Sequence, residues 1–181
     1  MTKKKFIAGV DCSTTTLGLC IYDPNIDRTV LAEYTDLSKF DGDDKIASAV
    51  YFILERCRGK VEKINIEDYL MGFAGGRTNM KTILTLAVFN GIVGYELSKV
   101  IPIERINVTR ARKKVGFSNN RDFRIMKKIS GDKNYTKTCI MDLAKLTEPN
   151  FAGMLTDFKD KNDNYRKQAY DVVDAWVMSR Q

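Results

Sequence analysis

Short apolar runs separated by polar turns dominate the first part of the chain. Phe6–Val10 and Leu17–Tyr22 are apolar and flank the hydroxyl-bearing turn Ser13–Thr16, a pattern that predicts a strand, a tight turn and a second strand. Three further strands are predicted at 28–34, 61–67 and 101–108. The chain therefore begins as an antiparallel sheet and adds two later strands.

Helical spacing of apolar residues follows between and after these strands. The predicted helices span 41–58, 79–99, 109–116, 121–128, 136–146 and 164–179, and residues 151–163 are predicted to be polar and irregular. The 181-residue chain has no Pro-, Gly- or Ser-rich linker. We therefore expect one α/β domain over residues 1–181.

Positive charge is concentrated in one segment of the chain. The net charge is +7, and residues 105–145 contain 12 Lys or Arg and three Asp, which leaves about −2 for the remainder. A basic segment on a mildly acidic protein favours a polyanionic partner, with a solvated surface as the alternative.

Several classes of chemistry are excluded by composition. The chain has no histidine, which excludes Ser-His-Asp, Cys-His and H-E-x-x-H mechanisms. The four cysteines have no C-x-x-C spacing, so neither a zinc site nor a disulfide framework is indicated. The longest uncharged run, Thr82–Tyr95, is too short to cross a bilayer. We expect a cytoplasmic protein without a membrane segment.

Four carboxylates occupy notable positions in this pattern. Asp11 and Glu67 each end a predicted strand, and Asp171 and Asp174 are three residues apart, on one face of the last predicted helix. For the helical pair alone, the simpler reading is that Asp171 faces solvent and Asp174 pairs with a neighbouring basic residue, Arg166 or Arg180. Because the last helix must pack on the sheet to bury its apolar residues, all four acids can converge.

A histidine-free cluster of acids suits hard cations such as Mg²⁺ or Mn²⁺, which also offset the repulsion among the carboxylates. Two such ions about 3.5 to 4 Å apart can promote phosphodiester hydrolysis.

The order and spacing of these motifs resemble those of the RuvC Holliday-junction resolvases over almost the whole chain. The matching elements are Gly9-Val-Asp11 with Ser13–Thr16 and Gly18, then Ile66-Glu67 before a Gly/aromatic loop, and finally Asp171-Val-Val-Asp174-Ala175. The chain departs from the family at Cys12-Ser13, where the family usually has Pro-Gly, and in its Gly75-Gly76 loop. We therefore expect a divergent member of bacteriophage type, acting in the bacterial host cytoplasm.

The resemblance implies an RNase H-like fold, with a five-stranded mixed sheet of three antiparallel and then two parallel strands flanked by helices. It implies an endonuclease that cuts branched DNA with two Mg²⁺ ions and leaves 5′-phosphate and 3′-hydroxyl ends. Asp11, Glu67, Asp171 and Asp174 would be the metal-binding acids. The expected DNA-contacting residues are Tyr69, Phe73, Arg77, Arg110, Arg112, Lys113, Lys114, Arg121, Arg124, Lys127 and Lys128.

Resolvases that this chain resembles dimerise through the helix that corresponds to 79–99, so a two-fold dimer is expected. Three alternatives remain open at this point. An RNase H-like nuclease could act on structured RNA, as in ribosomal RNA processing, and a non-catalytic module could bind junctions or RNA. The Gly-x-Asp-x-Ser/Thr motif also resembles the first phosphate loop of sugar and acetate kinases, although no second such loop follows.

Overall fold

One mixed five-stranded sheet organises the chain in the computed structural model, which describes residues 5–68, 80–132 and 134–181. The strands are β1 (Phe6–Cys12), β2 (Thr16–Asp23), β3 (Arg28–Asp36), β4 (Val61–Glu67) and β5 (Ile103–Ile106). Their order is β3-β2-β1-β4-β5; β1 to β3 pair antiparallel, and β4 pairs parallel with both β1 and β5. The predicted fold class is confirmed.

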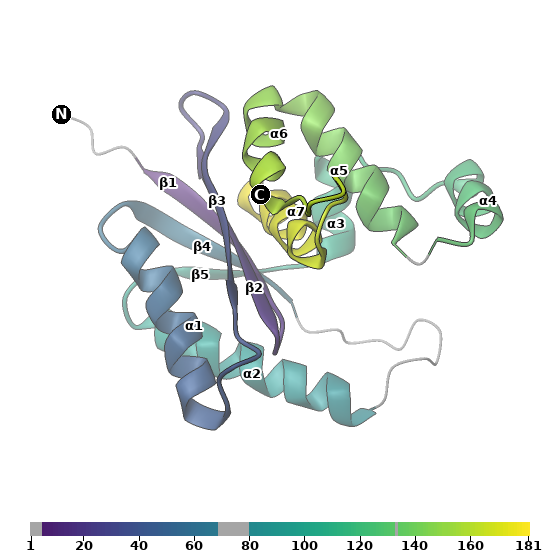
Figure 1. Cartoon of the computed structure of the whole chain (residues 1–181). Helices are drawn as coiled ribbons and strands as arrows, with labels where there is room; N and C mark the ends of the chain where they lie inside the picture. Colours follow the sequence, from purple (N-terminus) through teal and green to yellow (C-terminus); the bar gives the residue numbers. More distant parts are fainter. Residues whose placement is uncertain (1–4, 69–79, 133) are drawn as a thin grey trace.

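Helices cover both faces of the sheet, as Figure 1 shows. One face is covered by α1 (Gly42–Cys57) and α2 (Met80–Ser98). The other is covered by α3 (Val108–Lys114), α5 (Tyr135–Thr147), α6 (Pro149–Leu155) and α7 (Lys167–Ser179). Helix α4 (Arg121–Ser130) buries no residue and lies out beyond α5. No helix in the described ranges is long and apolar enough to cross a bilayer.

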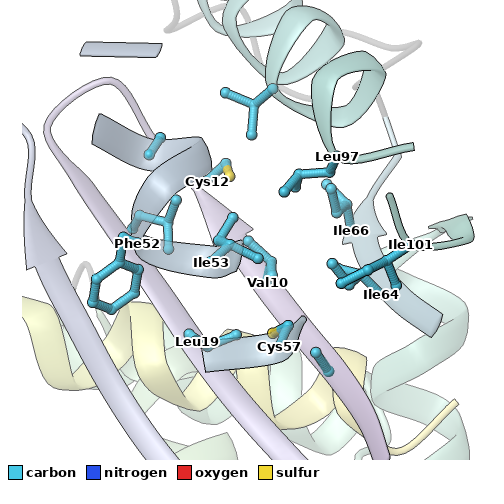
Figure 2. Packing of buried hydrophobic residues seen from close by; sticks show 14 of the residues in the cluster. Val10, Cys12, Leu19, Phe52, Ile53, Cys57, Ile64, Ile66, Leu97 and Ile101 are labelled. Carbon is cyan, nitrogen blue, oxygen red and sulfur yellow. The ribbon is translucent and has the colours of Figure 1, made fainter. Parts of the chain in front are cut away.

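The first core fills the space between the sheet and helices α1 and α2 (Figure 2). Val10 and Ile66 from neighbouring strands meet Ile53 of α1 and Leu97 of α2 there, and all four side chains are fully buried. Alternate strand residues point to the opposite face, where Trp176 of α7 belongs to a second core. Two apolar layers thus hold the sheet from both sides.

Helix α7 approaches the sheet most closely at two glycines. A methyl group on Gly9 of β1 would overlap the Ala175 carbonyl oxygen and lie 2.9 Å from the Met178 carbonyl carbon. One on Gly18 of β2 would overlap the carbonyl of Asp171. The absence of side chains at both positions lets the α7 main chain rest directly on β1 and β2.

The prediction of an irregular segment at 151–163 was wrong in its first half. Residues Pro149–Leu155 form α6, and Thr156–Phe158 form a 3₁₀ turn, η1. Pro149 favours a helix start because its φ is fixed and it needs no N–H partner there. Phe151 and Leu155, four residues apart, are fully buried, and Phe151 stacks on Trp176 at 5.7 Å. Two apolar residues in one short helix form too weak a periodic signal to recognise.

Candidate active site

Two of the predicted acids are neighbours because of strand register. In the parallel pairing of β1 with β4, Val10 lies opposite Ile66, so the next residue on each strand is an acid. Asp11 and Glu67 therefore lie side by side at the C-terminal ends of these strands. Both are only partly accessible to solvent. This is the edge of an α/β sheet at which ligands usually bind.

The other two acids come from α7. Asp171 and Asp174 are 6% and 5% exposed, an unusual degree of burial for carboxylates. The contact of α7 with Gly9 and Gly18 brings this pair to the end of β1, beside Asp11, which pairs with Gly18 in β2. The four acids thus lie close enough to interact electrostatically.

Two basic side chains neutralise the α7 pair. Arg112 of α3 donates from Nη2 to Asp174 Oδ1 at 2.8 Å. Lys137 of α5 places Nζ 3.1 Å from Asp174 Oδ2 and 3.4 Å from Asp171 Oδ1. Oδ2 of Asp171 is buried and accepts no hydrogen bond from any described residue. The site therefore contains a buried carboxylate oxygen that no described residue satisfies.

The simpler alternative for the helical pair, with Asp171 in solvent and Asp174 paired with Arg166 or Arg180, does not hold. Asp171 is buried, and Asp174 pairs with Arg112 and Lys137. Arg180 instead pairs with Asp27 at 2.6 Å and with the buried Glu148. It lies six residues beyond Asp174, whereas residues three or four apart share a helix face.

The acids raise one another's pKa values because their negative charges repel. Burial, followed by the charges of Asp174 and Glu67, raises the pKa of Asp11 well above its usual value. Burial and then Asp174 raise the pKa of Glu67. Burial also raises the pKa of Asp171, although Lys137 partly counteracts it. Because the carboxylates influence one another in this way, they form one electrostatic unit.

Lys137 is the site residue that sequence reasoning missed. Burial lowers its pKa, but Asp174 and Asp11 overcome this effect and raise the pKa above its usual value, so Lys137 is protonated at neutral pH. A signal was available, because Ile140, Met141 and Ala144 are buried and lie on the same face of α5. A lysine on the apolar face of a helix is expected to meet buried acids.

The predicted DNA-contacting residues separate into three groups. Tyr69, Phe73 and Arg77 lie outside the described residues. Arg112 contacts Asp174 rather than open solvent, with a side chain 22% exposed. The remaining basic residues are solvent-exposed on α3 and α4, namely Arg110, Lys113, Lys114, Arg121, Arg124, Lys127 and Lys128. They extend from the acid site toward α4.

The described acids do not have the geometry of a metal-binding site. In the described ranges, no three Asp, Glu or Cys side chains are arranged so that together they could hold a metal ion. The ammonium of Lys137 and the guanidinium of Arg112 instead neutralise Asp174. A divalent ion would therefore require these side chains to rearrange.

The sheet order, the strand directions and the acid-bearing strand ends define an RNase H-like fold. At least three solved structures are each similar over 96% of this chain. Thermus thermophilus RuvC, solved alone, has 12% identity, a TM-score of 0.54 and 92% of its own chain covered. Fowlpox virus resolvase in complex with substrate Holliday junction DNA has 14% identity, a TM-score of 0.50 and 93% covered.

The RuvC of the same Thermus species, in complex with a Holliday junction substrate, matches at 12% identity and a TM-score of 0.52 with 91% of its chain covered. The chain therefore has the fold of these junction resolvases. No protein-family model matches its sequence. No curated protein matches it by sequence.

Proposed function

We propose that this protein is a metal-dependent endonuclease that cuts branched DNA, four-way junctions above all, and leaves 5′-phosphate and 3′-hydroxyl ends. One observation supports the proposal most strongly. Asp11, Glu67, Asp171 and Asp174 meet at one site in the fold that the junction resolvases share. A cluster of buried acids costs stability, and such clusters are typical of functional sites.

The four acids would hold Mg²⁺ or Mn²⁺, two ions per site. Their donor atoms are all carboxylate oxygens, the ligands these cations prefer. The buried, unsatisfied Oδ2 of Asp171 and the raised pKa of Asp11 both fit a cation that is bound there in the working state. When bound, the ions would supply charge neutralisation and Lewis acidity to phosphodiester hydrolysis.

Two basic side chains, Lys137 and Arg112, would make the site favourable for binding a phosphate group. Protonated Lys137 lies against Asp171 and Asp174, and Arg112 holds Asp174 from the other side. Both groups limit the repulsion among the acids and keep positive charge beside the position of the bond to be cut. The exposed basic residues of α3 and α4 would bind neighbouring backbone phosphates.

A two-fold dimer through α2 belongs to the same proposal. Leu84, Val88, Ile92 and Tyr95 form an exposed apolar stripe on α2, and Val88 is 59% exposed. Beside Ile92, a groove of about 530 Å³ opens toward Tyr51 of α1. A second copy packed on this stripe would pair two acid sites, which suits a junction with two strands to cut.

The dimer has a direct test in sedimentation equilibrium at micromolar concentration. We expect Val88→Glu to weaken self-association by about 100-fold or more, because it would bury a charge in the interface. Leu146→Glu likewise replaces an exposed apolar side chain with a charged one, but on α5, and should leave the association unchanged. A monomeric wild-type protein would contradict the dimer.

The activity test compares labelled four-way junctions, forks, linear duplexes and structured RNA in Mg²⁺. Asp174→Asn should lower junction cleavage by about 100-fold or more and retain junction binding, because the basic surface is unchanged. Asp157→Asn, the same exchange at an exposed acid, should cut normally. Equal cleavage by Asp174→Asn and wild type would refute the assignment, and preference for RNA would change the substrate class.

A further inference from the structure

A second pocket of about 330 Å³ lies beside the acid site, between α3, the start of α4 and the start of α5. Three basic residues line it together with short hydroxyl and amide side chains. They include Arg112, Lys113, Arg124, Ser118, Asn119 and Thr136. Among the described residues, no Asp or Glu lines this pocket. Its walls therefore offer hydrogen-bond donors and positive charge to a small anion.

Arg112 belongs to both the pocket and the acid site. Its Nη2 donates to Asp174, whereas its Nε is buried and has no hydrogen-bond partner in the described ranges. A buried, unpaired N–H is costly, and a planar guanidinium can serve two acceptors at once. Arg112 thus lies between Asp174 and the pocket, with one guanidinium N–H committed to Asp174 and the side chain forming part of the pocket wall.

Aromatic contacts hold the pocket in shape, although α4 contributes nothing to the domain core. Phe117, which lines the pocket, meets Phe123 edge-to-face at 5.0 Å, and Phe123 contacts Tyr135 at 5.4 Å. Asn120 caps α4 by accepting from the Phe123 amide at 2.8 Å. These contacts tie the first turn of α4 to α5, so Arg124 is held at the pocket wall before any ligand arrives.

We propose that this pocket binds one phosphodiester group of the DNA backbone, adjacent to the bond being cut but distinct from it. The proposal rests on the proposed function, since it assigns a subsite within the same DNA-binding surface. Guanidinium groups recognise phosphate through paired, charge-assisted hydrogen bonds, which the Arg112 and Arg124 side chains can supply. The link from Arg112 to Asp174 would fix this phosphate at a set distance from the acids, and so fix which bond is presented for cleavage.

The test uses four-way DNA junctions in which single phosphates near the cut position are replaced by uncharged methylphosphonates. Binding is measured without divalent metal, so that no strand is cut. Wild type should lose about 3- to 10-fold in affinity at one replaced phosphate. Arg124→Gln should bind the unmodified junction more weakly by a similar factor, with a salt slope shallower by about one, and should lose less than about 2-fold at that phosphate.

Lys60→Gln is the matched control, because Lys60 is exposed at the opposite end of β1 and β4, where the strands begin. It should show the full wild-type loss at the replaced phosphate. If Arg124→Gln keeps the wild-type loss at every position, the pocket assignment is overturned while the junction nuclease stands. If wild type neither prefers junctions to linear duplex nor cuts them in Mg²⁺, the proposed function itself fails, and the pocket's assigned ligand fails with it.

Discussion

Replacing Asp11 with asparagine should stabilise the metal-free protein while abolishing cleavage. Asp11 is held near three other carboxylates, and burial together with Asp174 and Glu67 raises its pKa well above the usual value. A carboxyl group whose pKa is higher in the folded state contributes stability that is complete below its unfolded pKa. That stability is lost as pH rises through the folded pKa. At neutral pH, the buried Asp11 carboxyl therefore destabilises the fold.

The size of the effect follows from linkage. Each unit by which the pKa is raised corresponds to about 1.4 kcal/mol at neutral pH. Because Asp11 is partly accessible and the asparagine amide must still find partners, we expect a net gain of about 1 to 2 kcal/mol. For a chain of this length, that gain is a rise in Tm of roughly 2 to 8 °C.

The assay is thermal unfolding in EDTA at pH 7 and at pH 4, with junction cleavage in Mg²⁺ measured in parallel. The gain of Asp11→Asn over wild type should be largest at pH 7 and shrink toward pH 4, where wild-type Asp11 takes up a proton. Asp157→Asn, at an exposed position, should change stability by less than about 0.5 kcal/mol. A lower Tm for Asp11→Asn at pH 7, or a gain independent of pH, would refute the reasoning.

Three further substitutions test other parts of the structure. Gly9→Ala should lower the free energy of unfolding in urea by about 2 to 4 kcal/mol through overpacking against α7, whereas Gly153→Ala, which has open space, should be neutral or stabilising. Lys137→Met should destabilise the metal-free protein by about 1 to 3 kcal/mol by leaving Asp171 and Asp174 short of a partner, and Mg²⁺ should restore most of that loss; no effect in EDTA would contradict the ion pairs. Glu148→Gln should cost about 2 to 4 kcal/mol, because Glu148 accepts from Trp176 at 2.8 Å and pairs with Arg180, yet leave cleavage by the folded fraction intact; lost cleavage with normal stability would contradict a structural role.

The sheet was predictable because strand residues alternate or form short apolar runs between turns. The acid pair of Asp11 and Glu67 was also within reach, since both residues directly follow buried strand positions. The basic partners of Asp171 and Asp174 were harder to predict, because ion pairs between distant elements depend on how helices pack. The apolar face of α5 marks Lys137 as a residue that meets buried acids, but no local pattern identifies Asp174, 37 positions away by subtraction of their numbers, as its partner.

Local signals also failed where a helix was short. The helix at Pro149–Leu155 has only two core residues, Phe151 and Leu155, and the buried Glu148 directly precedes it. Glu148 can be buried because it accepts a hydrogen bond from the Trp176 indole and pairs with the Arg180 guanidinium. Both partners lie in or just after α7, about 30 residues further along the chain. Partners this far apart in the sequence can be identified only from the three-dimensional structure.

The position of α7 on the sheet is set by its contact with Gly9 and Gly18 and not by the packing of side chains there. Because main chain rests on main chain at these positions, the distance between the helix and the strand ends does not depend on the volume of any side chain at the contact. Core residues such as Ile53 and Leu97 lie in the layer on the other face of the sheet and take no part in this contact. The spacing between α7 and the ends of β1 and β2 is therefore set by two positions that have only a hydrogen atom in place of a side chain.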